Sequence, residues 1–221
     1  MGMTTPGTHQ FDVLDSELLH ESPILALRRD TLAMPGGGTG RREIVEHFGA
    51  VAVVAERDGE IALVRQYRHS VQDRLWELPA GILDIDGEDE HVTARRELAE
   101  EAGLAADRWE VLCDLVTSPG FCEETVRVYL ARDLHEVDRG EAEHEEADMT
   151  FSWTPLEEAR AMVLRGEIIN SIAIAGIMTA AEVLAGRGEA RPVDTPNPWR
   201  PQALAARRRA AGVGPDLKKM P

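Results

Sequence analysis

The chain has 221 residues, of which 43% are hydrophobic, and this length suits one globular domain with a small appended module. Its formal net charge of −16 argues against a nucleic-acid backbone as the main partner, because phosphates repel an acidic surface. No stretch approaches the roughly 20 apolar residues of a membrane helix, and the first residues lack the basic and apolar regions of a signal peptide. Two isolated cysteines, Cys113 and Cys122, indicate free thiols in a reducing cytoplasm. Together with the absence of a long apolar stretch, this leads us to expect a cytoplasmic protein with no membrane partner.

The first third of the chain is rich in predicted strands. Short β-branched and apolar runs predict strands at 23–30, 42–48, 50–55, 61–68 and 75–81. The run at 50–55 is apolar throughout, as expected for a strand buried on both faces. Gly36-Gly37-Gly38 could suggest a phosphate loop, but the Gly-Lys-Ser/Thr ending is missing, so we expect a hairpin turn.

The rest of the chain mixes helices and strands. A helix is expected over 88–102, with Val92, Leu98 and Leu104 as apolar anchors and Gly103 as its C-terminal stop. Further strands are expected at 108–117, 124–133 and 149–154, and helices at 156–165 and 169–186. Connections this short exclude a doubly wound parallel sheet and favour a mixed α/β sandwich. The proline- and arginine-rich segment 191–221 is expected to be partly ordered.

The chemistry is concentrated on the helix over 88–102. Glu97, Glu100 and Glu101 are three and four residues apart and therefore share a helix face, where like charges repel. A solvated acidic face is one explanation. The other is a hard divalent cation between the carboxylates, Mg²⁺ or also Mn²⁺, which would let a strongly acidic protein hold a phosphorylated substrate. Arg96 is placed to orient one of the carboxylates.

The stretch from Gly81 to Leu104 resembles the Nudix box. The resemblance rests on Gly81, Glu88, the Arg96-Glu97 and Glu100-Glu101 pairs and Gly103, and it is complete from Glu88 onward. Six residues separate Gly81 from Glu88, whereas the family pattern has five, so the loop is one residue longer. The family implies an α/β/α sandwich that hydrolyses nucleoside diphosphates linked to another group. It also implies Glu97, Glu100, Glu101 and the Ala80 carbonyl as metal ligands, with Glu101 among the catalytic residues.

Stretches around the box resemble the ADP-ribose pyrophosphatase branch of the family. Pro119, fifteen residues past Leu104 and followed by Gly120, is typical of that branch, and both are expected near the substrate. The resemblance implies hydrolysis of ADP-ribose to AMP and ribose 5-phosphate. Two alternatives stay open: another nucleoside diphosphate sugar such as GDP-mannose, and a non-catalytic module that binds ADP-ribose.

The branch also implies a general base and a dimer. By resemblance, the base is Glu146, with Glu145 as the neighbouring alternative, in the acidic segment 136–148. Arg68 and Arg74 are candidates for binding phosphate or ribose, although either could be an ordinary surface arginine. In this branch a small N-terminal antiparallel sheet, here within residues 1–47, is exchanged between two subunits, which implies a homodimer with shared active sites. The Nudix domain itself is expected over 48–190.

Overall fold

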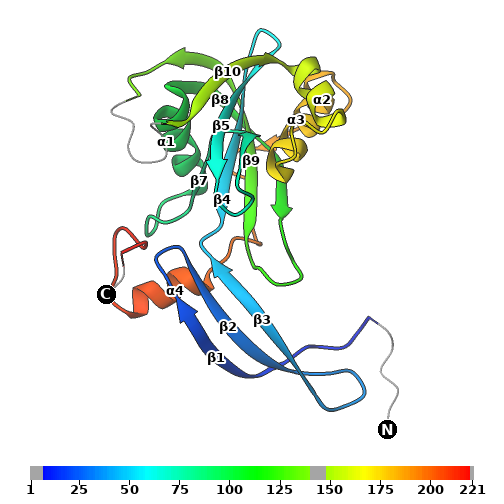
Figure 1. Cartoon of the computed structure of the whole chain (residues 1–221), viewed down its shortest axis with the longest axis vertical. Coiled ribbons are helices and arrows are strands. Elements are labelled where there is room, and N and C mark those ends of the chain that lie inside the picture. The colour runs from blue at the N-terminus through cyan, green and yellow to red at the C-terminus, as the bar shows by residue number, and fades with distance from the viewer. Residues whose placement is uncertain (1–6, 140–147, 220–221) are drawn as a thin grey trace.

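The computed structural model describes residues 7–139 and 148–219, and its N-terminal strands form a sheet of their own (Figure 1). Strands β1 (Val13–Glu21), β2 (Leu25–Ala33) and β3 (Thr39–His47) pair antiparallel in that order. The β2–β3 connection contains Gly36, Gly37 and Gly38, all at positive φ, so the triple glycine is a hairpin turn as expected. The small N-terminal antiparallel sheet is thereby confirmed.

A larger mixed sheet carries the rest of the fold, in the order β10-β5-β4-β9-β8-β11, with β6 paired to β5 and β7 to β4. Its strands are β4 (Ala50–Arg57), β5 (Glu60–Arg68), β6 (Asp73–Glu77), β7 (Ala80–Ile82), β8 (Leu104–Val116), β9 (Thr125–Glu136), β10 (Thr150–Pro155) and β11 (Arg191–Pro192). Strands β4 and β9 run parallel, and their other pairings in the sheet are antiparallel. The single strand expected at 75–81 is divided into β6 and β7, because Pro79 has no amide proton to donate to a ladder.

Helices cover both faces of the larger sheet. Figure 1 shows α1 (Glu90–Ala102) on one side and α2 (Leu156–Leu164) with α3 (Ser171–Leu184) on the other. Successive β4 side chains alternate between the two cores: Val53 packs in the cluster that contains Leu98 of α1, and Val54 packs in the cluster that contains Ile177 of α3. This arrangement confirms the predicted α/β/α sandwich.

Helix α1 has well-defined ends. The Asp89 side chain accepts the His91 amide proton at 2.9 Å, and Gly103 ends the helix in the left-handed region at φ 66°. Leu98 and Leu104 are buried, as expected. Val92 was expected to anchor the helix and is instead 50% exposed, so this expectation is wrong. It lies on the side of α1 that turns away from the core residue Leu98.

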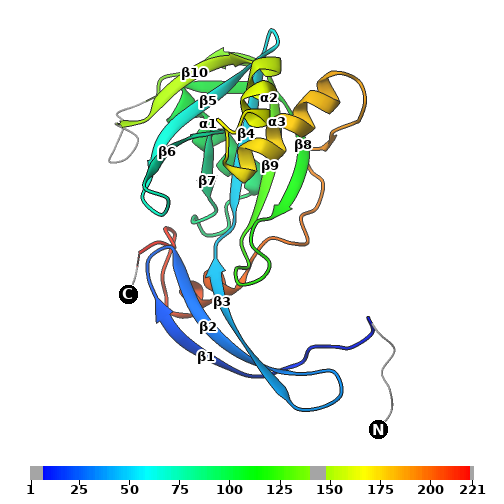
Figure 2. The same cartoon turned by 45° about the vertical axis from the view of Figure 1, so that its right-hand side comes forward.

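The C-terminal segment differs from its expected partial order. Strand β11 pairs with β8, and helix α4 (Ala203–Ala210) lies beside the N-terminal sheet (Figures 1 and 2). The side chains of Leu204, Arg208 and Leu217 are fully or almost fully buried, which explains why the segment is folded. No helix in the described part of the chain is long and apolar enough to cross a membrane.

Candidate active site

The acidic face of α1 packs against the backbone at the start of β7. Glu101 is buried, and its Oε2 accepts the backbone amide proton of Ala80 at 2.9 Å. The Glu97 side chain is 13% exposed, whereas that of Glu100 is 47% exposed. The exposure of the three glutamates therefore increases from Glu101, which is buried against β7, through Glu97 to Glu100, which faces solvent.

Arg96 contacts three carboxylates of the box through one guanidinium group. Its Nη1 donates to Glu97 Oε1 at 2.7 Å and to Glu100 Oε2 at 3.1 Å, and its Nη2 donates to Glu88 Oε2 at 3.3 Å. Thr93 Oγ1 also donates to Glu88, at 2.7 Å. Burial by itself would lower the pKa of Arg96, but the surrounding carboxylates outweigh it and raise that pKa. Arg96 therefore contacts Glu88, Glu97 and Glu100 through one guanidinium group.

Gly81 is the point where the β7 backbone meets the helix. A Cβ atom at this position would lie 2.0 Å from Glu97 Cδ, closer than real Cβ contacts come. The glycine is therefore needed for the Glu97 carboxylate to lie against the strand. The additional residue of the loop is accommodated between β7 and α1, without separating Gly81 from the helix.

Glu97 is poorly solvated for a carboxylate. Burial raises its pKa to about 7; the Arg96 guanidinium opposes this shift, and the nearby charges of Glu100 and Asp84 add to it. Asp84, which lies in the β7–α1 loop, is itself buried. Nothing in the sequence singles out Asp84, since one aspartate in a loop of the box carries no distinguishing signal.

The carboxylates fit a hard divalent cation by their chemistry. In residues 7–139 and 148–219, no group of three or more His, Cys, Asp or Glu side chains is placed so that together they could hold a metal ion. Glu97 and Glu100 are instead held by Arg96, and Glu101 by the Ala80 amide. Burial disfavours the charged form of Glu97, and a divalent cation beside it would favour that form. Glu97, Glu100, Glu101 and the Ala80 carbonyl are the groups that could hold such an ion.

The two candidate substrate-binding arginines lie on neighbouring strands and are both engaged. Arg68 on β5 makes a two-pronged contact with the buried Glu77 carboxylate, at 3.0 Å from Nε and 2.6 Å from Nη2. Arg74 on β6 forms an ion pair with Asp148 and donates to its carbonyl oxygen at 3.4 Å. Each arginine side chain is roughly two-fifths exposed.

Pro119 and Gly120 line a cavity of about 540 Å³ between the β8–β9 connection and the N-terminal sheet. The connection is fastened to β3, because Val45 donates its amide proton to the Phe121 carbonyl at 2.7 Å. Arg28 and Arg42 from the N-terminal sheet also line the cavity. Neither arginine could be predicted from the sequence, since nothing local in the chain links residues 28 and 42 to residue 120.

The expected general bases, Glu146 and Glu145, lie outside the described residues. The flanking described residues contact elements of the site. Arg139 Nε donates to the Glu100 carbonyl oxygen of α1 at 2.9 Å, and Asp148 pairs with Arg74 of β6. The described residues on either side of the acidic segment therefore lie beside α1 and β6.

Comparisons with known proteins agree with this geometry. Residues 45–172 match the family model of the NUDIX domain. The chain is 59% identical, over 90% of its length and 97% of the relative's, to a Mycobacterium tuberculosis protein named ADP-ribose pyrophosphatase. It is 35% identical, over 70% of its length and 84% of the relative's, to a Bacillus subtilis protein of the same name. Among solved structures, an ADP compounds hydrolase matches with a TM-score of 0.74 and 21% identity, covering 83% of this chain and 99% of that one, a likeness of fold.

Proposed function

The chain belongs to the Nudix family, and from this premise we propose that it hydrolyses the pyrophosphate of ADP-ribose, giving AMP and ribose 5-phosphate. The observation that carries the reaction is the face of α1 on which Glu97 and Glu101 lie against Gly81 and Ala80. The choice of ADP-ribose is supported by the 59% identity to the Mycobacterium tuberculosis pyrophosphatase, which extends over most of both chains.

The proposed cofactor is Mg²⁺, with Mn²⁺ as a possible substitute, held by Glu97, Glu100, Glu101 and the Ala80 carbonyl. When bound, the ion neutralises charge on the pyrophosphate oxygens and lowers the pKa of a coordinated water. In the net reaction, a water oxygen forms a bond to one phosphorus, and the bond from that phosphorus to the bridging oxygen breaks. The bridging oxygen leaves with the other phosphate, so each product is a monophosphate.

The chain's own residues position and activate these reactants. Arg96 keeps Glu97 and Glu100 turned toward one another, which fixes the direction of the ligand oxygens. Glu146 is proposed as the base that accepts the proton of the attacking water, with Glu145 as the alternative. Arg68, Arg74 and the cavity at Pro119 and Gly120 are proposed to contact the phosphates and riboses of the substrate.

The direct test of the function incubates the purified chain with ADP-ribose and Mg²⁺ and quantifies the products. AMP and ribose 5-phosphate should appear in equal amounts. Glu101→Gln should remove most of this activity by weakening metal binding, whereas Glu157→Gln on the exposed face of α2 is the matched control. Absence of hydrolysis in the wild-type protein refutes the function, and near-normal turnover of Glu101→Gln at modest Mg²⁺ refutes the metal assignment.

The base assignment needs a separate pair of variants. Glu146→Gln should lower kcat with little change in KM, because the residue is proposed to move a proton and not to bind substrate. If Glu145→Gln carries the loss instead, the base is the neighbouring residue.

We also propose a cytoplasmic homodimer that does not bind nucleic acid, with active sites shared between subunits. Exposed apolar side chains of the N-terminal sheet support this association: Val13, Leu14 and Leu18 on β1 are each more than two-fifths exposed, as is Phe11 just before it. Light scattering on the purified protein should give a mass of two chains. A mass of one chain at micromolar concentration would contradict the dimer.

A further inference from the structure

The C-terminal residues contact every second residue of the segment that runs from Asp84, in the loop after β7, to Glu90, the first residue of α1. We call residues 191–218 the C-terminal strap. Its contacts with the loop and the first residue of α1 are Lys218 Nζ to Asp84 Oδ2 at 2.6 Å, Arg209 Nη1 to Asp86 Oδ1 at 2.9 Å, Arg200 to the Glu88 carbonyl at 3.2 Å, and Asn197 Nδ2 to Glu90 Oε1 at 2.8 Å. These contacts follow the loop from just after β7 to the start of α1.

Backbone hydrogen bonds reinforce the side-chain contacts. The Asp86 amide donates to the Pro215 carbonyl, and the Leu217 amide donates to the Asp84 carbonyl, both at 2.8 Å. Leu217 is 1% exposed and belongs to the same core cluster as Leu98 of α1. The end of the strap is therefore packed into the core beneath the catalytic helix and paired with the loop.

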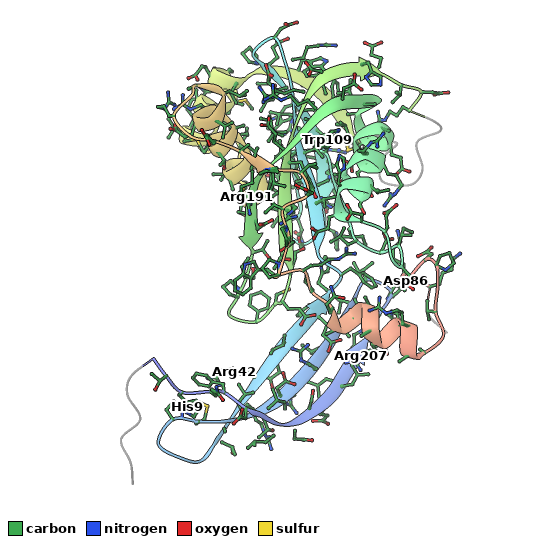
Figure 3. The ribbon with its side chains drawn as sticks, turned by 180° about the vertical axis from the view of Figure 1, so that it is seen from behind. His9, Arg42, Asp86, Trp109, Arg191 and Arg207 are labelled. Carbon is green, nitrogen blue, oxygen red and sulfur yellow. The ribbon has the colours of Figure 1, made fainter. Side chains whose placement is uncertain are left out.

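The strap is anchored at its other side to the N-terminal sheet. Arg207 of α4 pairs with the buried Glu46 of β3 at 2.8 Å, and the fully buried Arg208 pairs with Glu21 of β1. Figure 3 shows Arg207 on α4 and Asp86 on the loop that faces the segment after it. The triple arginine 207–209 thus joins the N-terminal sheet to the loop of the active site.

Asp84 is the contact of the strap that lies closest to the chemistry. It is buried, and its charge acts on the Glu97 carboxylate, where burial is the larger influence. The Lys218 ammonium is also within electrostatic reach of Glu97. A buried carboxylate without its partner is destabilised, so loss of the ammonium would force Asp84 and its loop to move.

We propose that Lys218 is a positioning residue for the hydrolysis: its ion pair with Asp84 holds the loop that leads into α1, and so keeps Glu97 against Gly81. The family match ends at residue 172, well before the strap, so this role belongs to a part of the chain that the Nudix domain does not include. The turnover and metal-binding parts of the test rest on the proposed function and its cofactor, whereas hydrogen exchange does not.

The test compares Lys218→Met, Lys218→Arg and Lys219→Met in the full-length protein. Lys219 is the matched control, because its side chain is 77% exposed and its ammonium lies 3.9 Å from Asp216. Lys218→Met should lower kcat for ADP-ribose about tenfold with KM changed less than about twofold, since displacement of a ligand by a fraction of an ångström affects the reacting geometry more than binding. Lys218→Arg should recover most of kcat, and Lys219→Met should match the wild type. A Lys218→Met variant within about twofold of wild-type kcat, or an equal loss in Lys219→Met, overturns the proposal.

A second readout needs no substrate. Mn²⁺ binding to the protein, measured by electron paramagnetic resonance, should weaken severalfold in Lys218→Met, and the loop peptide that contains Asp86 should exchange its amide hydrogens faster. If Lys218 acted only as a competing cation, its removal would tighten Mn²⁺ binding, and that result overturns the positioning role. Wild-type protein that binds Mn²⁺ but leaves ADP-ribose intact would refute the proposed function while these two measurements still test Lys218.

Discussion

Replacing Glu97 with glutamine should stabilise the metal-free protein at alkaline pH, although it removes a carboxylate that the reaction is proposed to need. Glu97 is largely buried between Arg96 and the β7 backbone at Gly81, where its charged form is poorly solvated. Glutamine has nearly the shape of the protonated glutamic acid and carries no charge. The substitution therefore isolates the free energy of holding a charge at this position.

The size of the effect follows from the pKa of Glu97, which burial raises to about 7 from its ordinary value of 4.5. Between these two pH values the folded chain keeps a proton that the unfolded chain has released, so stability falls as the pH rises through this window. The difference of about 2.5 between the two pKa values corresponds to about 3 kcal/mol at 1.36 kcal/mol per pKa unit. This penalty is absent below pH 4.5 and fully present above pH 7.

Urea unfolding in the presence of a chelator measures this penalty. Wild type and Glu97→Gln should have free energies of unfolding within about 1 kcal/mol of each other at pH 4.5, whereas at pH 8.5 the variant should be more stable by about 3 kcal/mol. Glu157→Gln, whose side chain is 78% exposed, should show no such dependence on pH. The reasoning is refuted if the difference between wild type and Glu97→Gln is the same at both pH values.

Two further substitutions test the contacts around the site. Gly81→Ala should lower kcat at least tenfold with the circular dichroism spectrum unchanged, because a Cβ would come within 2.0 Å of Glu97; wild-type turnover would contradict the close packing. Arg127→Ala should reduce the free energy of unfolding by about 3 kcal/mol, the lower end for a broken buried pair, because Asp114 loses a partner now 2.7 Å away but keeps Arg191 at 2.8 Å. A loss below about 1 kcal/mol in urea unfolding would show that this buried pair contributes little.

The features that the sequence predicted well are those set by local patterns. The all-apolar run of β4 indicated a strand buried on both faces, and the structure shows its side chains divided between the two cores. Gly103 predicted the end of α1 because only a residue tolerant of positive φ suits that position. The spacing of Glu97, Glu100 and Glu101 likewise predicted one shared face, since helical periodicity alone decides it.

Features that depend on contacts distant in the chain could not be predicted in this way. The strap looked like a loose tail because its proline- and arginine-rich composition is typical of such tails. Its order depends on the burial of Leu204 and Leu217 and on the pairing of Arg208 with Glu21, almost two hundred residues earlier. Similarly, the exposed side of α1 at Val92 depends on how the helix is rotated against the sheet, which its weakly amphipathic sequence does not decide.

The candidate site likewise combines features set by local spacing with features set by contacts that are distant in the chain. Gly81 and Arg96 can be singled out from the sequence because their spacing to the glutamates is fixed in the chain. The engagement of Arg68 by the buried Glu77 depends on the register of β5 and β6, which places the two residues on paired strands. Arg28 lines the cavity at Pro119 because β3 is hydrogen-bonded to the β8–β9 connection and Arg28 itself pairs with Glu123 of that connection at 3.1 Å.

The most direct test of the central claim is a competition between ADP-ribose and GDP-mannose at equal concentration in one reaction with Mg²⁺. The ratio in which the two substrates are consumed gives the ratio of their kcat/KM values. We expect AMP and ribose 5-phosphate to form in equal amounts well ahead of any product from GDP-mannose. Preferred consumption of GDP-mannose, or binding of ADP-ribose without release of AMP, would contradict the assignment of this chain as an ADP-ribose hydrolase.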